Sequence, residues 1–526
     1  MSASKPAKPA KPVQSGIQET LQPPSARAAS LRWHDDGACE AGNAGNGVNA
    51  NDAARAARAI SGLSGLSGLS AVQLLAAYRA RTLSPVEVTR AVIAHIERCE
   101  PQLHALYAFD PDAALAQARA SEARWLGGEA LALDGLPLTL KENIATRGTP
   151  MPLGTAATLL TPMPDDAPPA ARMREAGAVL LAKTTMPDYG MLSSGLSSFH
   201  PLTRNPWDLT KNPGGSSAGA AAAAAAGYGP LHVGTDIGGS LRLPAAWCGI
   251  FSLKPSLGRI PIKPAYTGRV AGPMTRTVAD AALMMGPLSR PDWRDPTSLP
   301  PQAIDWQQLD RPVKGLRLGL LMDAGWGMAV EPETAAAVQA AARLFEQAGA
   351  QVELLAPFST RAMIDGLDRF WRMRSGLDIG ALSPARQALV LPYIRAWVAS
   401  GAQLTAPELF HAHSQIAALR DAAIAACEPF DYVLSPVSPV PAFAAELASP
   451  LDDPARPFEH IAFTVPYNMS EQPAASINCG YTAAGLPIGL QIAGQRFDDL
   501  GVMQLAAAFE QMRGTQRAWP GSESDC

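Results

Sequence analysis

Short apolar segments that alternate with helical segments constrain the fold of this chain more than any other feature. Residues 179–181 follow a helical stretch that ends at Gly177, and residues 316–321 precede an expected helix over 333–348 and a further apolar segment at 351–354. This strand–helix–strand order is typical of sheets with parallel neighbouring strands and helices on their faces. The sequence therefore predicts an α/β fold with a central, mostly parallel mixed β-sheet covered by helices on both faces.

Composition divides the chain into one long ordered part and two ends. Residues 1–68 combine Lys-Pro repeats with Gly, Ser, Asn and Asp and lack apolar periodicity, as disordered extensions do. We expect order to begin near Ser70, a single domain over 69–520, and a flexible C-terminus at 521–526. Because residues 1 to about 60 cannot bury enough apolar surface to offset their ordering entropy, we expect them to be dispensable for activity.

A helix start is encoded immediately after this boundary. Ser84 is a favourable N-cap, Pro85 suits the first helical position, and Glu87 can complete a capping box. The apolar spacing over residues 88–96 continues one helical face.

Charge and cysteine usage exclude several classes of function. The 526 residues carry a formal net charge of −4, which gives no electrostatic case for nucleic acid or an anionic membrane as partner. No stretch reaches the roughly 18 apolar residues of a membrane span, and the first residues lack the apolar core of a signal peptide, so a cytoplasmic location is expected. The six cysteines are scattered without a CxxC pair and are expected to be reduced thiols: Cys39, Cys99, Cys248, Cys427, Cys479 and Cys526.

Two clusters of glycine and serine carry the candidate chemistry. The first is Gly214–Gly219, and the second runs from Gly234 to Arg242 and contains Gly238-Gly239-Ser240. Nucleophilic attack on a carbonyl needs a hydroxyl and backbone N–H groups aimed at the developing oxyanion, and such clusters can supply both. Lys141 follows an alternating apolar run upstream and is a candidate base.

In their order and spacing these residues resemble the amidase signature family, and specifically its stand-alone bacterial-type amidases. That family combines a lysine, a GGSS(G/A)G cluster before an Ala-rich helix, and a GTDxGGS(I/L)R(I/L)PA cluster, and the chain matches this pattern from Lys141 to Ala245. The flanks at 203–208 and 249–255 are also similar, and a weaker likeness extends from about 69 to 517.

The resemblance implies a Ser–cis-Ser–Lys triad. Ser240 would be the nucleophile that forms an acyl-enzyme, and Ser216, held on a cis peptide bond after Gly215, would relay protons. Lys141 would be the base, which must be neutral to act, so burial has to lower its pKa far below the usual value of roughly 10.4. The relay serine would also return the proton to the departing nitrogen.

The same resemblance implies the groups around the triad. The backbone N–H groups of Ile237, Gly238, Gly239 and Ser240 would form the oxyanion hole. Supporting roles fall to Asp236, Arg242 and Ser217; for the first two, stabilising the loop and stabilising charge remain equally open. The substrate pocket would be bordered by the loop over 463–467 and by Gly190, Met191 and Leu192, which suggests an apolar or aryl acyl group.

Other residues offer competing hypotheses. The stretch from Gly215 to Gly219 matches the G-x-S-x-G elbow of α/β-hydrolases with Ser217 as nucleophile, but that elbow must follow a strand, and residues 209–213 are polar and end in proline. His411 and His413 are expected on the surface, and His232 is expected to be a packed histidine.

The expected function is hydrolysis of a carboxylic amide C–N bond in a small molecule, without metal or cofactor. The alternatives are a carbamate or urea hydrolase of the same family, or the A subunit of a glutamine-dependent tRNA amidotransferase. That protein holds the glutamine amino group with an aspartate, whereas Ile461 stands at the matching position here and cannot balance an ammonium. An inactive scaffold would require a lost catalytic residue, and none is missing. No nucleic-acid or membrane partner is expected, and a homodimer is left open.

Overall fold

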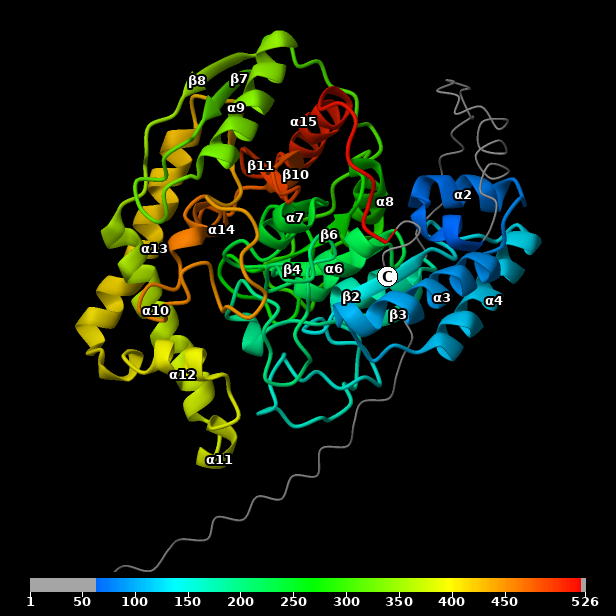
Figure 1. The fold of residues 1–526 in the computed structure, drawn as a ribbon, viewed down its shortest axis with the longest axis horizontal. Coiled ribbons are helices and arrows are strands. Elements are labelled where there is room, and N and C mark those ends of the chain that lie inside the picture. Colours follow the sequence, from blue (N-terminus) through cyan, green and yellow to red (C-terminus); the bar gives the residue numbers. More distant parts are fainter. Residues whose placement is uncertain (1–62, 522–526) are drawn as a thin grey trace, which may run out of the picture. The chain divides into compact units, whose positions relative to one another are not determined.

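The computed structural model describes residues 63–521, which form one α/β domain around an eleven-stranded sheet (Figure 1). The strand order is β1-β3-β2-β4-β6-β5-β10-β11-β9-β7-β8. The strands are β1 (Leu106–Tyr107), β2 (Pro137–Lys141), β3 (Val179–Thr184), β4 (Leu231–Asp236), β5 (Phe251–Lys254), β6 (Val270–Thr275), β7 (Arg317–Leu320), β8 (Gln351–Leu354), β9 (Tyr432–Pro436), β10 (Ala474–Tyr481) and β11 (Pro487–Gly494).

Helices occupy most of the segments between the strands. The α-helices are α2 (Ala71–Arg79), α3 (Pro85–Leu103), α4 (Pro111–Gly127), α5 (Pro168–Glu175), α6 (Ala218–Ala226), α7 (Arg242–Cys248), α8 (Val278–Leu288), α9 (Pro332–Gln347), α10 (Arg361–Gly380), α11 (Pro384–Gln387), α12 (Pro392–Val398), α13 (Ala406–Cys427), α14 (Val465–Met469) and α15 (Asp499–Met512). Short 3-10 helices are η1 (Leu63–Gly68), η2 (Asp188–Gly190), η3 (Gly401–Gln403) and η4 (Glu459–Ile461).

The α/β fold with a mixed sheet is confirmed, but the expectation that most strand pairs are parallel is wrong. Strand β2 pairs in parallel with β3 and β4, and β7 pairs in parallel with β8 and β9. The other six pairings are antiparallel. The strand–helix–strand units therefore lie toward the two sides of the sheet, and antiparallel strands form its middle. One antiparallel pair there is β10 and β11, which follow each other in the chain. The alternation of apolar and helical segments in the sequence did not reveal their short connection.

Helices cover both faces of the sheet, as predicted. On β11, Leu490 and Ile492 belong to the same buried cluster as Val502 and Met503 of α15. Gly489 faces the opposite way, where a Cβ atom on it would lie 2.4 Å from the Cβ of Ala246 in α7. Because successive residues of a strand point to opposite faces, α7 and α15 lie on opposite sides of the sheet.

Several local predictions are confirmed. Helix α3 begins at Pro85 with Ser84 as N-cap, and the capping box with Glu87 is formed in both directions. The expected strand–helix–strand unit is present as β7, α9 and β8. Local capping and apolar period were sufficient to predict these elements.

The two predicted flexible ends lie almost wholly outside the described residues. Within the extension assigned to 1–68, only residues 63–68 are described, and they form η1. Ordered α-helical structure then starts at Ala71, with Ser70 as N-cap. Among the described cysteines, Cys248, Cys427 and Cys479 are free, whereas Cys99 is disulfide-bonded, so the expectation of six reduced thiols is wrong at Cys99.

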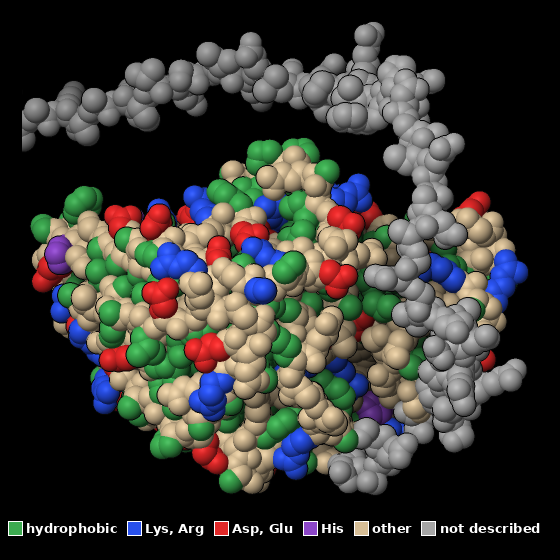
Figure 2. Space-filling model, turned by 90° about the horizontal axis from the view of Figure 1, so that it is seen from above, with side chains coloured by type: hydrophobic (Ala, Val, Ile, Leu, Met, Phe, Trp, Pro, Cys, Tyr) green, Lys and Arg blue, Asp and Glu red, His purple; other side chains and the backbone are tan. Residues whose placement is uncertain are grey.

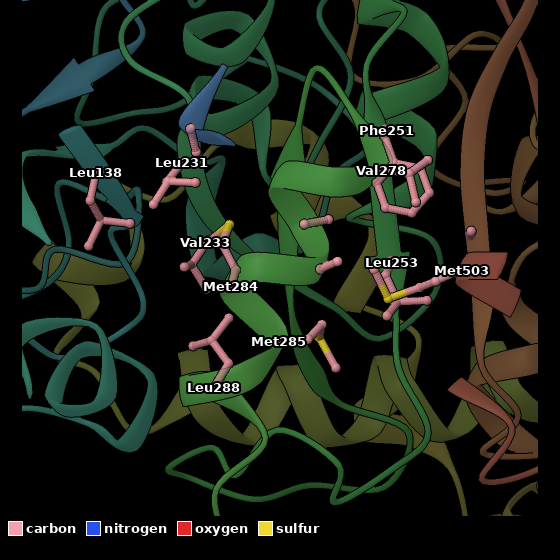
Figure 3. Packing of buried hydrophobic residues seen from close by; sticks show 14 of the residues in the cluster. Leu138, Leu231, Val233, Phe251, Leu253, Val278, Met284, Met285, Leu288 and Met503 are labelled. Carbon is pink, nitrogen blue, oxygen red and sulfur yellow. The ribbon is translucent and has the colours of Figure 1, made fainter. Parts of the chain in front are cut away.

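The main core packs α8 and α15 against the middle of the sheet (Figure 3). In β2, Leu138 and Leu140 are buried in this core, so the alternation of the strand turns Thr139 and Lys141 to the opposite face. The side chains labelled in Figure 3 come from β2, β4, β5, α8 and α15: Leu138, Leu231, Val233, Phe251, Leu253, Val278, Met284, Met285, Leu288 and Met503.

Helix α6 is buried on every side. Its nine residues are alanine apart from Gly219, and it packs against β2, β3, β4 and β6. A Cβ atom on Gly219 would lie 2.1 Å from the carbonyl oxygen of Ala105, so only glycine fits there. The absence of larger side chains lets this helix sit deep in the domain, with Ser217 at its N-terminus.

The surface shows mixed charge. On the face seen in Figure 2, Lys and Arg side chains are interspersed with Asp and Glu. Within residues 63–521, no helix has both the length and the apolar character that crossing a membrane would need.

Candidate active site

The candidate site lies at the carboxyl ends of two neighbouring parallel strands. Lys141 is the last residue of β2, and Asp236 is the last residue of β4. The pairing of Leu140 with Val233 brings these two ends to the same edge of the sheet. In open α/β sheets this edge is where ligands commonly bind, and both glycine–serine clusters meet there.

Lys141 lies against the first cluster. Its side chain is completely buried, and Nζ lies 2.7 Å from Oγ of Ser216 and 3.0 Å from Oγ of Ser217. Ser217 is fixed in turn by the backbone of Thr235, donating to its carbonyl over 3.1 Å and accepting from its N–H over 3.3 Å. The lysine amine is therefore held between two hydroxyl groups.

The electrostatics of Lys141 favour the neutral amine. Burial lowers its pKa well below the ordinary value for lysine, and the positive charge of Arg269 lowers it further. Asp236 and Glu142 act in the opposite direction but do not outweigh burial. A neutral amine can accept a proton from a neighbouring hydroxyl.

Ser216 combines an unusual backbone with a tight environment. The peptide bond between Gly215 and Ser216 is cis, as the resemblance implied, and Ser216 is 4% exposed. Gly190 packs directly against it, since a Cβ atom on Gly190 would lie 3.2 Å from the Ser216 Oγ. Gly190 also has a φ of 71°, which disfavours side chains.

The second cluster presents free backbone N–H groups. Among the described residues, the N–H groups of Ile237, Gly238 and Ser240 have no hydrogen-bond acceptor. The expectation that Gly239 joins them is wrong in this structure, because its N–H donates to the Asp236 carboxylate over 2.7 Å. Gly239 instead supplies the turn, with a φ of 130° that residues with side chains rarely adopt.

Asp236 and Arg242 form a completely buried ion pair behind this loop. The Arg242 guanidinium donates to Asp236 through Nε over 3.0 Å and through Nη2 over 3.1 Å. The carboxylate also accepts from the backbone N–H of Leu241. Burial alone would raise the pKa of Asp236, but the charge and hydrogen bonds of Arg242 hold it well below its usual range.

Arg242 further joins the Gly238–Gly239 turn to distant segments. Its Nη1 donates to the carbonyl of Thr464 over 2.8 Å, and its Nη2 to the side chain of Asn468 over 2.6 Å. The Thr464 hydroxyl donates to the carbonyl of Gly238 over 2.7 Å. Arg242 lines neither of the two compartments described below, which favours the loop-stabilising role over direct charge stabilisation.

These contacts correct one expectation about the pocket. The loop over 463–467 lines neither compartment; it lies behind the Gly238–Gly239 turn and supports it. Sequence reasoning missed this role of Thr464 and Asn468, because no local pattern reveals a partner more than 200 residues away.

Two compartments meet at Ser240. One is mainly apolar. Its aromatic walls come from α10, α12 and the residue before η4 (Trp371, Tyr393, Trp397 and Phe458), and Ile461 of η4 adds an aliphatic side chain. Phe458 packs edge-on against both tryptophans, at centroid distances of 5.2 and 5.6 Å. Helices α10 and α12 pack together in the yellow part of Figure 1. No sequence motif marks these residues, which come from segments up to about ninety positions apart.

The other compartment is mainly polar. Its polar and charged lining comprises Asn143, Tyr189, Ser216, Thr235, Asp236, Ser240, Tyr266, Arg269, Arg374 and Asp378. Ser216 belongs to this compartment alone, whereas Ile237 and Ser240 line both. Of the residues predicted to bind substrate, Gly190 and Met191 border both compartments and Leu192 borders the apolar one.

The competing hypotheses find no support in the geometry. Residues 209–213 form no strand, and Ser217 is completely buried, unlike an exposed elbow nucleophile. His232 is packed between Thr139 and the Gly229 carbonyl, and burial lowers its pKa to about 4. His411 and His413 are exposed on α13, as expected.

Within residues 63–521 no group of three or more His, Cys, Asp and Glu side chains is arranged to hold a metal ion. The groups that the site itself supplies for chemistry are a buried amine, three hydroxyl groups and three free N–H groups.

Known proteins resemble this chain over most of its length. The sequence matches the Amidase family over residues 87–503. The A subunit of the glutamyl-tRNA(Gln) amidotransferase of Myxococcus xanthus (strain DK1622) is 36% identical over 471 residues, which cover 84% of this chain and 96% of the relative.

Solved structures of amidases share the fold. A bacterial aryl acylamidase of the amidase signature family has a TM-score of 0.77 at 30% identity, covering 84% of this chain and 96% of its own. The peptide amidase of Stenotrophomonas maltophilia has a TM-score of 0.74 at 27% identity, covering 86% and 99%. On the extent of these matches, the chain belongs to the amidase family and is an amidase signature enzyme.

Proposed function

We propose that this protein is a stand-alone amidase that hydrolyses a carboxylic amide through an acyl-enzyme on Ser240. Ser216 relays protons and Lys141 is the base. The observation that carries the proposal is the buried contact of 2.7 Å between Lys141 Nζ and Ser216 Oγ, beside three free N–H groups. A neutral lysine in this position can accept the proton that a serine must lose to attack a carbonyl.

In the first step the Ser240 oxygen attacks the carbonyl carbon while its proton moves to Ser216, whose own proton moves to Lys141. The carbonyl oxygen becomes negative and is stabilised by the N–H groups of Ile237, Gly238 and Ser240. As the C–N bond breaks, the protons return along the same path and Ser216 protonates the departing nitrogen. Water then attacks the Ser240 ester by the same relay and releases the acid.

The apolar compartment supports an aryl or other apolar acyl group. Gly238, whose N–H group is free, lines this compartment alone, so the carbonyl of a bound amide would enter from this side. Trp371, Trp397 and Phe458 supply aromatic walls on which a flat acyl group can pack.

The relatives with the amidotransferase name make glutamine hydrolysis a second candidate. Glutamine carries an ammonium group that needs a carboxylate partner. Within the described lining of the apolar compartment there is no Asp or Glu, and Ile461 is 4% exposed there. Burying an unpaired ammonium against such a wall is costly, which supports the amidase over the glutamine-dependent reaction.

A substrate panel tests the proposal directly. The full-length protein is incubated with benzamide, benzanilide, glutamine, phenylurea and a phenyl carbamate, and released ammonia or amine is measured. We expect turnover of the aryl amides to exceed that of glutamine, the urea and the carbamate. Preferred glutamine hydrolysis would favour the amidotransferase-type reaction, and preferred urea or carbamate hydrolysis would replace the amide assignment.

The nucleophile is tested separately with a fluorophosphonate probe and peptide mass mapping. Label is expected on Ser240 and should disappear in Ser240→Ala, which should also lose amide and ester turnover to a similar extent. Label on Ser217 would instead support the hydrolase-elbow hypothesis and contradict the proposed triad.

A further inference from the structure

The lining of the polar compartment indicates which part of the substrate it receives. This inference rests on the proposed function, in which Ser216 returns a proton to the departing nitrogen. Ser216 lines the polar compartment alone, Gly238 lines the apolar one alone, and Ile237 and Ser240 line both. The amine portion of the amide must therefore lie in the polar compartment, with the acyl portion on the other side of Ser240.

Four charged side chains line that compartment, and three of them are already paired. Asp236 is bound by Arg242 behind the Gly238–Gly239 turn. Arg374 lies 3.6 Å from the Asp378 carboxylate, and its guanidinium stacks 4.6 Å above the Tyr266 ring. The remaining charged group is Arg269.

Arg269 has no anionic partner among residues 63–521. Its one side-chain hydrogen bond there runs from Nη1 to the carbonyl of Pro264 over 2.7 Å, and its backbone N–H donates to the carbonyl of Tyr266 over 2.9 Å. Burial, with Arg374 nearby, lowers the pKa of Arg269 to about 10, so it is still positively charged at neutral pH. The Tyr266 hydroxyl in the same lining is also buried without a hydrogen-bond partner.

We propose that Arg269 binds a carboxylate carried by the amine portion of the substrate. The substrate class is then an N-acyl derivative of an amino acid, with an apolar or aryl acyl group. A guanidinium presents several N–H donors in a planar fork that matches a carboxylate, and a partly desolvated site strengthens the pairing. Cleavage of the C–N bond, with one proton delivered by Ser216 and one water consumed, gives the apolar acid and the free amino acid.

The test compares two substrates that differ in one charge. N-Benzoylglycine carries the carboxylate, and N-benzoylglycinamide is its neutral counterpart with the same acyl group. We measure kcat/KM for cleavage of the benzoyl–nitrogen bond with the unaltered protein, with Arg269→Gln and with the control Lys263→Gln. Lys263 is exposed, lies six positions away and lines neither compartment, so the control removes one nearby positive charge without touching the site.

The ratio of the two substrates is the decisive quantity, because any effect of Arg269 on Lys141 acts on both substrates and cancels. We expect the unaltered protein and Lys263→Gln to prefer N-benzoylglycine by about 10- to 100-fold, and Arg269→Gln to bring the ratio near one. A ratio near one in the unaltered protein, or a ratio that Arg269→Gln leaves unchanged, would overturn the proposal.

A binding measurement distinguishes the loss of the proposed anion site from the loss of the proposed amidase activity. Titration of Ser240→Ala with each compound in a calorimeter reports the charge preference without any turnover. Absence of turnover on every amide, together with preferred binding of N-benzoylglycine that is lost when Arg269→Gln is added, would reject the amidase and keep the anion site. Turnover of both compounds with equal binding would keep the amidase and reject the anion site.

Discussion

Lys141 and Lys183 lie on the neighbouring strands β2 and β3 and are buried to nearly the same degree, yet they face different partners. Lys183 Nζ donates to the carbonyl of Ile144 and, over 2.6 Å, to the Thr146 hydroxyl. Lys141 Nζ meets two serine hydroxyls at the edge of the polar compartment. Burial lowers the pKa of both amines, to about 7 for Lys183.

The difference shows that burial alone does not make a lysine a base. Lys183 ties the segment after β2 to β3: the Ile144 carbonyl has no proton to give, and the Thr146 hydroxyl already donates to that carbonyl over 3.2 Å and lines neither compartment. Of the two serine partners of Lys141, Ser216 lines the polar compartment and can carry a proton between it and the amine. The neighbours of each amine therefore decide between a structural role and a proposed catalytic one.

Replacement of each lysine by methionine tests directly whether the two amines have different roles, and it should give the largest effects. For Lys141→Met we expect amide turnover to fall by about 10²- to 10⁴-fold, because the base is lost, with little change in melting temperature. For Lys183→Met we expect destabilisation by about 1–3 kcal/mol, because the buried Thr146 hydroxyl loses its donor and the Ile144 carbonyl loses one of its two donors, with kcat of the folded enzyme nearly unchanged. Steady-state kinetics and thermal unfolding measure both. Equal losses of kcat in the two variants would remove the distinction.

The two hydroxyl partners of Lys141 are also expected to differ in role, and replacing each by alanine tests this. Ser216→Ala should reduce amide turnover by about 10²- to 10³-fold and reduce activated-ester turnover much less, since an ester leaving group needs little protonation. Ser217→Ala should cost about 10-fold on both substrates, because Ser217 fixes Lys141 but does not face the compartment. Amide and ester kinetics of the two variants give the answer. An equal amide-to-ester bias in both would contradict the relay assigned to Ser216.

A smaller effect is expected on the pH profile. Lys141 must be neutral to act, so kcat/KM should rise with pH as it deprotonates. Since the charge of Arg269 lowers the pKa of Lys141, Arg269→Gln should raise that pKa and move the rising limb to higher pH. The measurement uses a neutral amide, so that substrate charge plays no part. A limb that moves to lower pH would contradict the electrostatic coupling.

The smallest effect concerns the stability contributed by Lys183. Its pKa of about 7 in the folded protein lies below the ordinary value of 10.5, so between these values the unfolded chain holds a proton that the folded protein lacks. Raising the pH through this window should therefore stabilise the unaltered protein relative to Lys183→Met, by at most about 1.4 kcal/mol per pH unit. Urea unfolding at pH 7 and pH 9 measures the difference. A difference that stays constant would show that Lys183 does not titrate there.

Features that depend on neighbouring residues were predicted from the sequence better than features that depend on the packing of distant segments. The capping box of α3, the strand that ends at Lys141 and the two glycine–serine clusters depend on residues close together in the chain. The aromatic wall of Trp371, Trp397 and Phe458 depends on how distant segments pack, which no short pattern encodes. The engaged N–H of Gly239 could not be predicted either, because its orientation is set by the Asp236 carboxylate and by Thr464 more than 200 residues away.

The all-buried helix α6 has a consequence for how the enzyme can diversify. Any residue larger than alanine there would meet surrounding strands that have no room to yield, so the frame that carries Ser216 and Ser217 tolerates almost no mutation. The wall around Trp371 and Trp397 stands on separate helices that can repack without disturbing that frame. Under selection for new substrates, substitutions should therefore accumulate in α10 and α12 and change the substrate specificity, while the residues that carry the reaction stay the same.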